Sequence, residues 1–164
     1  MRIADTIQDS IVDGPGFRFV VFTQGCFHNC PGCHNPATHD PDGGKEIAVE
    51  DVIREMRKNP LTDGVTLSGG EPFLQPAACA DIAEAAKADG LNVWAYSGWT
   101  YEELLKRADA DPETARLLRL VDVLVDGPFI LAEKSMDVKW RGSRNQRLID
   151  VKRSLEEGTA VIRD

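Results

Sequence analysis

The sequence predicts an α/β fold built on one open, mostly parallel sheet of about five or six strands. Short apolar segments rich in Val, Ile and Phe alternate with segments whose apolar residues recur at helical spacing. Strands that alternate with helices pair in parallel through right-handed crossovers. The 164 residues suit one domain and are too few for a closed eight-stranded (β/α) barrel. We therefore expect a single domain over residues 1–164, without internal repeats or an interdomain linker.

The first half of the chain is expected to form two strands, with a long loop and a helix between them. Residues 18–23 are rich in Val and Phe and lead into a glycine, which predicts a buried strand. Prolines and glycines suppress regular structure over residues 25–45. Apolar side chains at i, i+3, i+4 and i+7 predict an amphipathic helix over residues 49–56, ending near Asn59. Residues 64–68 then predict a short strand.

The alternation continues in the second half of the chain. A helix over residues 76–89 is expected to end at Gly90, and residues 91–96 predict the next strand. Thr100 and Glu103 form the pattern of a capping box, which predicts the start of another helix.

The last third of the chain is expected to hold one more helix and up to three strands. Asp111 followed by proline predicts a helix start, and this helix runs to about residue 120. Residues 121–125 predict an apolar strand. Residues 146–151 and 159–162 are two further short strand candidates, separated by a helical or turn-like segment over residues 153–157.

The composition is that of an ordinary soluble protein with an acidic balance. Hydrophobic residues make up 42% and charged residues 28%, and 19 Lys and Arg against 27 Asp and Glu give a net charge of −8. This balance provides no electrostatic footprint for nucleic acid or for an anionic membrane. No apolar run approaches the ~20 residues of a membrane span, and the N-terminus lacks the apolar stretch of a signal peptide. We therefore expect a cytoplasmic protein.

Three of the four cysteines, Cys26, Cys30 and Cys33, fall within eight consecutive residues. Disulfides are rare in a reducing cytoplasm, and an odd cluster of three cannot be paired off internally. A structural zinc site would need a fourth ligand to close a tetrahedron. The candidates for that ligand are His28, His34 and His39.

An iron–sulfur cluster fits the triplet better, because thiolates are its usual ligands. Three thiolates would leave one iron of a [4Fe–4S] cube open for an exogenous ligand. The remaining cysteine, Cys79, shares helical spacing with Ile82, Ala83 and Ala86, so we expect it in the core of a helix.

Residues 26–33 have the C-x3-C-x2-C spacing of the radical S-adenosylmethionine (SAM) enzymes, and the chain resembles that superfamily. Within it, the sequence is similar to the glycyl-radical-enzyme activases, above all those that act on anaerobic ribonucleoside-triphosphate reductases. The segments that carry the resemblance follow one another in the family's order over nearly the whole chain. They are 13–18 (DGPGFR), 22–25 (FTQG), 67–72 (LSGGEP), 93–99 (VWAYSGW), 123–129 (VLVDGPF) and 140–146 (WRGSRNQ).

The resemblance implies a partial, open (β/α) barrel of the radical SAM type, with a cluster loop over residues 25–45. It implies a [4Fe–4S] cluster held by Cys26, Cys30 and Cys33, whose open iron binds the methionyl group of SAM. An electron from the reduced cluster would cleave SAM to a 5′-deoxyadenosyl radical, which removes a hydrogen atom from a glycine of the large reductase. The electron would come from a donor such as a flavodoxin or a ferredoxin.

The family motifs follow the carboxyl ends of the predicted strands, where ligands bind in open α/β sheets. The resemblance implies that Glu71 accepts from the SAM ammonium group, and that a glycine pair before it lets backbone approach a ligand. The expected SAM contacts are Gly32, Cys33, His34, Gly69, Gly70, Glu71, Ser97, Asp126 and Arg141.

Several of these positions have a second interpretation. His34 could stack on adenine or be a solvated loop histidine. Asp126 could contact ribose or ammonium, or cap a helix. Residues 141–146, which start at Arg141 and supply guanidinium and amide donors, could bind the SAM carboxylate or a protein partner, or form a charged surface loop. Gly32 stands where many radical SAM enzymes carry an aromatic residue, although the activases that the chain most resembles commonly have glycine there.

Two other functions remain open from the sequence. One is an activase of a different glycyl radical enzyme, such as a formate lyase, although the short chain and residues 141–146 favour the reductase. The other is a non-enzymatic adaptor in which the cysteines and a histidine bind zinc or an iron–sulfur cluster only as structure.

Overall fold

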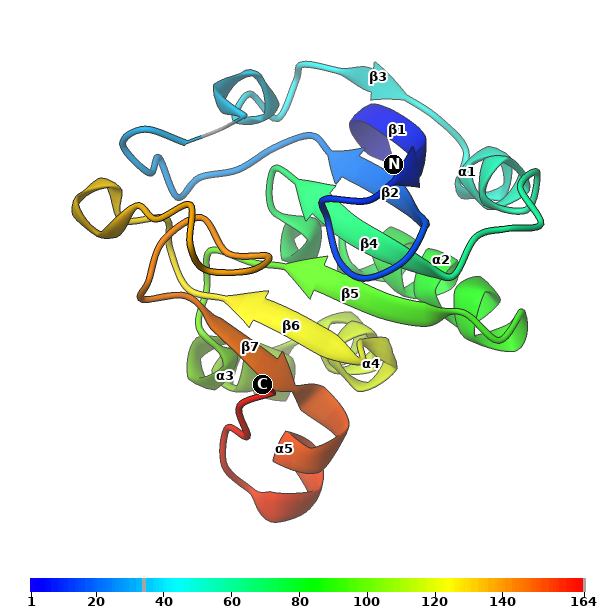
Figure 1. Ribbon diagram of the computed structural model, residues 1–164. Coiled ribbons are helices and arrows are strands. Elements are labelled where there is room, and N and C mark those ends of the chain that lie inside the picture. Colours follow the sequence, from blue (N-terminus) through cyan, green and yellow to red (C-terminus); the bar gives the residue numbers. More distant parts are fainter. Residues whose placement is uncertain (34, 164) are drawn as a thin grey trace.

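The computed structural model describes residues 1–33 and 35–163, and its centre is one seven-stranded sheet (Figure 1). The strand order is β3-β1-β2-β4-β5-β6-β7. The strands are β1 (Arg2–Ser10), β2 (Arg18–Thr23), β3 (Lys45–Glu46), β4 (Gly64–Gly69), β5 (Asn92–Tyr96), β6 (Val123–Asp126) and β7 (Arg147–Asp150). The α-helices of the described chain are α1 (Val49–Met56), α2 (Pro76–Ala88), α3 (Tyr101–Ala110), α4 (Pro112–Leu120) and α5 (Val151–Glu157).

The centre of the sheet is parallel and its edges are antiparallel. β2, β4, β5 and β6 pair in parallel, whereas β1, β3 and β7 pair antiparallel to their neighbours. The expectation of an α/β fold with an open, mostly parallel sheet is thus confirmed. The sheet has more strands than predicted, because β1 and β3 extend it beyond β2.

The C-terminal part differs in detail from the prediction. β7 is present, but residues 159–162 form only an isolated bridge from Ile162 to Ile149. The segment after β7 is a helix, which starts at Val151 with the Asp150 side chain accepting from the backbone N–H of Arg153. This cap, with Gly158 in the left-handed region at the other end, fixes α5 over two turns.

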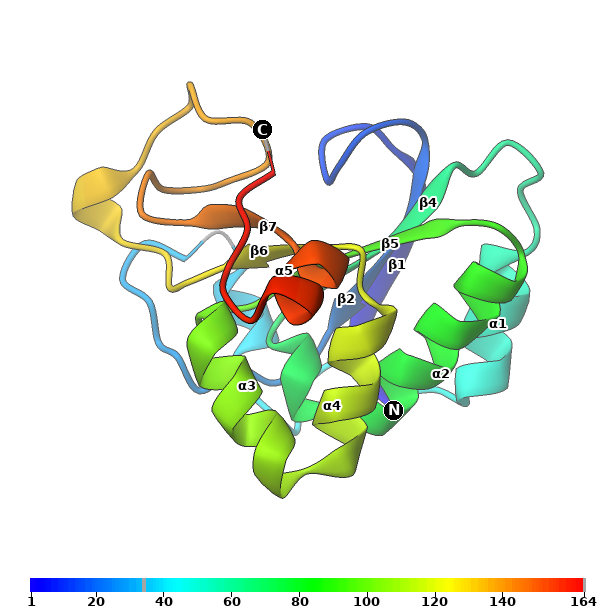
Figure 2. The same ribbon diagram turned by 90° about the horizontal axis from the view of Figure 1, so that it is seen from below.

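The two faces of the sheet are covered in different ways. Figure 2 shows α1, α2, α3 and α4 on one side, with the blue loop after β1 and the orange loop before β7 on the other. The helical side holds the main apolar core, and Cys79 is fully buried in it on α2, as its spacing predicts. Burial raises the pKa of the Cys79 thiol to about 12.

The loop side holds a smaller apolar cluster. Trp94 lies with Val123 and Val125 on this face of the sheet. Trp140, from the loop before β7, packs edge-on against Trp94 with ring centroids 6.0 Å apart. None of the helices in the described part of the chain is both long and apolar enough to cross a bilayer.

The carboxyl ends of the parallel strands meet at one edge of the sheet. The cysteine loop follows β2, Gly70 follows β4, Ser97 follows β5 and Gly127 follows β6 (Figure 1). The prediction that the sequence motifs gather at these strand ends is confirmed. This edge is therefore where a ligand site is expected.

Gly69 shows how closely the chain packs at this edge. Its φ is +96°, and a Cβ there would lie 2.5 Å from the backbone nitrogen of Thr23 and 2.6 Å from Cα of Phe22. Both neighbours belong to the adjacent strand β2, so the contact cannot be relieved by a side-chain rotation. A glycine is required here by the sheet itself.

We expect Gly69→Ala to lower the free energy of unfolding by at least about 2 kcal/mol, because a strained φ and an overpacked contact each cost on the order of 1–3 kcal/mol. Gly90→Ala is the matched control, since Gly90 also has a positive φ, +77°, but no atom lies within 4 Å of its added Cβ. Urea denaturation of the full chain measures both. Equal losses for the two variants would contradict the packing argument.

Candidate functional site

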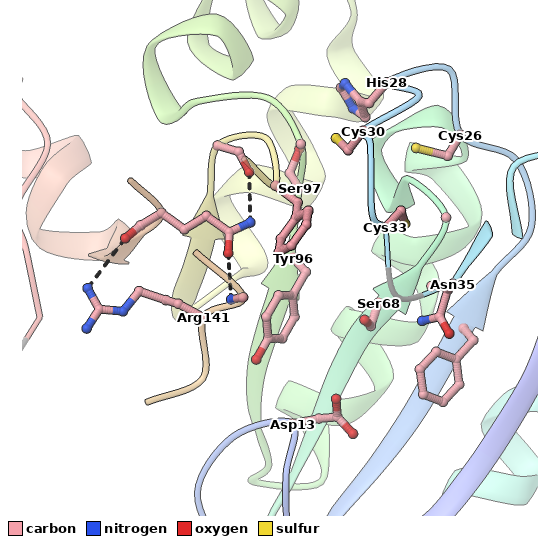
Figure 3. A pocket seen from close by; sticks show the side chains of 18 of the residues that line it. Asp13, Cys26, His28, Cys30, Cys33, Asn35, Ser68, Tyr96, Ser97 and Arg141 are labelled. Atoms are coloured by element: carbon pink, nitrogen blue, oxygen red, sulfur yellow. Dashed lines mark hydrogen bonds between the residues drawn. The ribbon is translucent and has the colours of Figure 1, made fainter. Parts of the chain in front are cut away.

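A cavity of about 400 Å³ lies at the carboxyl edge of the sheet. Cys26, Cys30 and Cys33 lie around one end of it, whereas Asp13 lies at the opposite end (Figure 3). Tyr96 and other side chains line the wall between these ends. The cavity thus joins the predicted cluster ligands to the ends of all four parallel strands.

The backbone closes the cysteine loop at its base. The N–H of Gly25 donates to the carbonyl of Thr38 at 2.7 Å, and the N–H of Cys26 donates to the carbonyl of His39 at 3.1 Å. Within the loop, the N–H of Cys33 donates to the carbonyl of Cys30 at 3.1 Å. The three cysteines are partly exposed, so a group bound in the cavity can reach their sulfur atoms.

The donor set fits a cluster better than a single ion. In the described ranges, no three His, Cys, Asp or Glu residues are grouped so that they could hold one metal ion. Each thiolate of a [4Fe–4S] cube binds a different iron, so its ligands are spread around the cluster and do not converge on one point. Burial raises the pKa of the Cys26 thiol, and the nearby charge of Glu71 adds to this shift.

The side chain of Glu71 is buried and makes four hydrogen bonds within the protein. Its Oε1 atom lies 2.7 Å from Nε2 of His28, and it accepts from the Ser97 hydroxyl and the Gly98 N–H, each at 2.8 Å. Its Oε2 atom accepts from the N–H of Phe73 at 3.0 Å. The prediction had Glu71 bind the SAM ammonium group; in the structure it is absent from the cavity lining, and its partners belong to the chain itself.

The glycine pair before Glu71 lines the cavity, but its lack of side chains serves the protein as well. A Cβ on Gly70 would collide with the carbonyl oxygen of Gly25, and would lie 3.0 Å from that of Thr38. Both atoms belong to the base of the cysteine loop. The glycine pair thus admits the neighbouring chain, and the expectation that it also lets backbone approach a ligand stays a prediction.

Ser97 and Asp126 differ in their position relative to the cavity. Ser97 lines it and accepts from the N–H of Trp99 at 3.0 Å while donating to Glu71. Asp126 is 1% exposed and is not a lining residue. Its carboxylate accepts from the N–H of Tyr101 at 2.8 Å and pairs with Arg147 at 2.5 Å and 3.0 Å. These contacts agree with the helix-cap interpretation of Asp126, and a contact with SAM stays a prediction.

Arg141 lines the cavity from the loop before β7. Gln146 gives this loop its shape, because its side chain accepts from the N–H of Gly142 at 2.8 Å and donates to the carbonyl of Gly127 at 3.0 Å. The Arg141 guanidinium donates to the carbonyl of Gln146 at 3.4 Å and has no carboxylate partner among the ion pairs of the described chain. It is thus available to an anionic group.

Gly32 and His34, on either side of Cys33, are both expected from the sequence to contact SAM. Gly32 is outside the cavity lining, and its added Cβ would lie 2.8 Å from Cδ1 of Leu131. With a φ of +76°, Gly32 lets the cysteine loop pack against the loop before β7, and its expected contact with SAM stays a prediction. His34 lies outside the described residues.

Sequence reasoning missed several lining residues. Tyr96 is the last residue of an apolar strand, and burial raises the pKa of its hydroxyl. Tyr96 lies directly before Ser97 at the carboxyl end of a predicted strand, and this position could have identified it as a lining residue. The other lining side chains not predicted as contacts include Asn35, His39, Ser68 and Gln146.

We expect Arg147→Met to lower the free energy of unfolding by about 3 kcal/mol, because it leaves the buried Asp126 carboxylate without its ionic partner. Glu102→Gln is the control, since Glu102 bonds to the same guanidinium but is 54% exposed at its side chain, so its loss costs less than about 1 kcal/mol. Urea denaturation at pH 7 compares them. A loss for Arg147→Met no larger than that for Glu102→Gln would contradict a structural role of the Asp126 pair.

Comparisons with known proteins bear on the cysteine loop directly. A family model described as a 4Fe-4S single cluster domain matches residues 12–149. Over 117 residues, the chain is 44% identical to the pyruvate formate-lyase-activating enzyme of Clostridium pasteurianum, a match that covers 66% of this chain and 49% of the relative.

Other relatives match over nearly their whole length. The anaerobic ribonucleoside-triphosphate reductase-activating protein of Escherichia coli K12 is 35% identical over 145 residues, which cover 83% of this chain and 90% of the relative. The protein of the same name from Enterobacteria phage T4 is 33% identical over 147 residues, with 84% and 86% covered. The chain therefore belongs to the family of the anaerobic ribonucleoside-triphosphate reductase-activating proteins, within the 4Fe-4S single cluster domains.

Proposed function

We propose that this protein is a radical SAM activase, which creates a glycyl radical on an anaerobic ribonucleoside-triphosphate reductase. The observation that carries the proposal is the placement of three cysteine sulfurs at one end of a cavity lined by the ends of four parallel strands. The family relationship supports the choice of partner, because these relatives are named as activating proteins of anaerobic ribonucleoside-triphosphate reductase.

The chain's residues fit a [4Fe–4S] cluster with one iron open to SAM. Cys26, Cys30 and Cys33 would hold the cluster, and no other cysteine lines the cavity, since Cys79 is buried in α2. When bound, the cluster would supply the electron for reductive cleavage of SAM, the chemistry that would lead to removal of a hydrogen atom from the partner's glycine. The protein's task is to place the two reactants and to keep water and side reactions out.

Some of the expected SAM contacts line the cavity and others do not. We propose that Cys33, the backbone of Gly69 and Gly70, Ser97 and Arg141 contact it, since all of them face the cavity. Gly32, Glu71 and Asp126 support the cavity wall from behind. These three residues would then affect SAM binding indirectly, by fixing the position of the chain segments that line the cavity.

The open sheet is consistent with a partial (β/α) barrel, whose wall would be formed by the parallel strands. Only four strands, β2, β4, β5 and β6, run in parallel, and loops cover their inner face. The site is therefore bordered by loops and not by further strands, which leaves an approach for the glycine loop of a large protein substrate. We further propose one domain over residues 1–164 with its cluster loop over residues 25–45, and a flavodoxin or ferredoxin as the electron donor.

A second candidate is the activation of a formate lyase. The 44% identity to the pyruvate formate-lyase-activating enzyme favours it, although that match covers about half of the relative. Incubating the reduced protein and SAM with each of the two partner enzymes separates the candidates. A glycyl radical signal in electron paramagnetic resonance (EPR) on the lyase alone would overturn the reductase proposal.

We expect replacement of Cys26, Cys30 or Cys33 by Ala to abolish both the cluster and SAM cleavage, because each thiolate binds its own iron. Anaerobic reconstitution, iron analysis and 5′-deoxyadenosine formation measure this, with about four irons per chain in the unchanged protein. Cys79→Ala is the control, and it should lose stability only. SAM cleavage that persists in a triplet variant, or is absent from the reconstituted unchanged protein, would contradict the proposal.

We expect Arg141→Met to raise the Kd for SAM about tenfold or more, because a hydrogen bond to a charged group contributes about 1.5–3 kcal/mol. Arg144→Met is the matched control, since Arg144 is an exposed residue of the same loop that does not line the cavity. Equilibrium binding to the cluster-loaded protein measures both. An unchanged Kd for SAM together with a raised KM for the reductase would instead assign Arg141 to the partner.

A further inference from the structure

His28 lies between Cys26 and Cys30 in the cysteine loop, and its ring contacts other residues on two sides. Its Nε2 atom is 2.7 Å from Oε1 of Glu71, and only 16% of its side chain is exposed. Its ring lies edge-on to the ring of Trp99, with centroids 4.7 Å apart. A carboxylate can only accept, so Nε2 carries the hydrogen and donates it.

The chain leaves room for this ring at the end of β5. A Cβ on Gly98 would lie 2.5 Å from Cδ2 of His28, and Gly98 has no positive φ that would require a glycine for other reasons. The absence of a side chain at Gly98 is thus explained by the His28 ring. The imidazole occupies a fitted position and is not an exposed loop side chain.

Glu71 is a fixed anchor for the ring. It follows β4 and is fully buried, and its other partners are the Ser97 hydroxyl and the N–H groups of Gly98 and Phe73. A carboxylate bound by that many donors in a buried place cannot turn without leaving several of them unpaired. A group attached to Glu71 is therefore tied to the ends of both β4 and β5.

We propose that His28 is a positioning residue, whose hydrogen bond to Glu71 holds the cysteine loop in place and tunes the reduction potential of the cluster. The inference rests on the proposed function, in that Cys26 and Cys30, two residues to either side of His28, bind iron. Loop placement follows from the bond itself, because it joins the segment between Cys26 and Cys30 to the strand ends.

The effect on the potential follows from charge. Reduction adds an electron to the cluster, and a carboxylate nearby disfavours that step unless donors compensate its charge. The Glu71 carboxylate lies directly beside the loop, since its Oε1 atom is 2.7 Å from Nε2 of His28, between Cys26 and Cys30. Without the donor from His28, the carboxylate is less compensated, so the potential of the cluster is expected to become more negative.

Two variants separate the hydrogen bond from the ring. His28→Phe keeps a ring beside Trp99 but has no donor, whereas His28→Gln keeps a donor without a ring. Phe27→Leu is the control, because Phe27 is the neighbouring residue of the same loop and is 66% exposed. The first readout is the rate at which iodoacetamide alkylates the loop cysteines in the full chain before iron is added. The second is the midpoint potential of the reconstituted cluster, measured by EPR without SAM.

We expect His28→Phe to alkylate about tenfold faster than the unchanged protein, as the loss of a charged hydrogen bond implies, and to have a more negative potential. His28→Gln should restore most of both values, and Phe27→Leu should change neither. Equal behaviour of the Phe variant and the unchanged protein would overturn the proposal, and so would a Gln variant as altered as the Phe variant. Failure of the unchanged protein to form a cluster would instead count against the proposed function, while the alkylation rates would still test the His28–Glu71 bond.

Discussion

The geometry of the site depends on the buried carboxylate of Glu71. A charged group without water must be bonded by the protein, and here its donors come from three separate segments: His28 in the cysteine loop, Ser97 and Gly98 after β5, and Phe73 beyond β4. None of these segments can shift alone without leaving a donor or the carboxylate unpaired. A single side chain thus couples the loop that carries the thiols to the strand ends that border the cavity.

Close backbone packing completes what Glu71 begins. The N–H of Glu71 donates to the carbonyl of Gly25, and the N–H of Gly70 donates to that of Thr23, each at 2.8 Å. The base of the cysteine loop is therefore attached to β4 as a continuation of the sheet. Gly69 and Gly70 permit this approach, since a Cβ on either would meet backbone atoms. The same approach leaves their backbone facing the cavity, where SAM is proposed to bind.

The central strands and the helices of this fold could be predicted from the sequence because they are apolar or amphipathic over a whole element. The strand β1 could not, because it carries polar side chains such as Asp5 and Gln8 along a partly exposed surface. The backbone hydrogen bonds between β1 and β2 do not require any particular side chains, so the composition of β1 does not predict a strand.

The site shows the same division. The cysteines and the strand-end motifs could be predicted, because parallel strands bring their carboxyl ends together in any such sheet. The partners of Glu71 could not, because they depend on where the loop places His28, 43 residues earlier in the chain.

The opposite end of the cavity is fixed by a second buried charge, that of Arg18. Its side chain is fully buried, and burial lowers its pKa to about 10. It donates to the Thr66 hydroxyl at 2.7 Å and to the carbonyl of Pro15 at 3.0 Å, while the Thr66 hydroxyl donates to the carbonyl of Asp13 at 2.7 Å. A buried cation that is bonded only to neutral acceptors lowers the stability of the fold. The role of Arg18 is therefore to fix the position of the segments that it contacts. Arg18 and Thr66 attach the loop of Asp13 to the inner face of β2 and β4, as Glu71 attaches the cysteine loop to the strand ends. In a sheet that does not close into a barrel, these two attachments set the distance between the thiols and the far wall of the cavity.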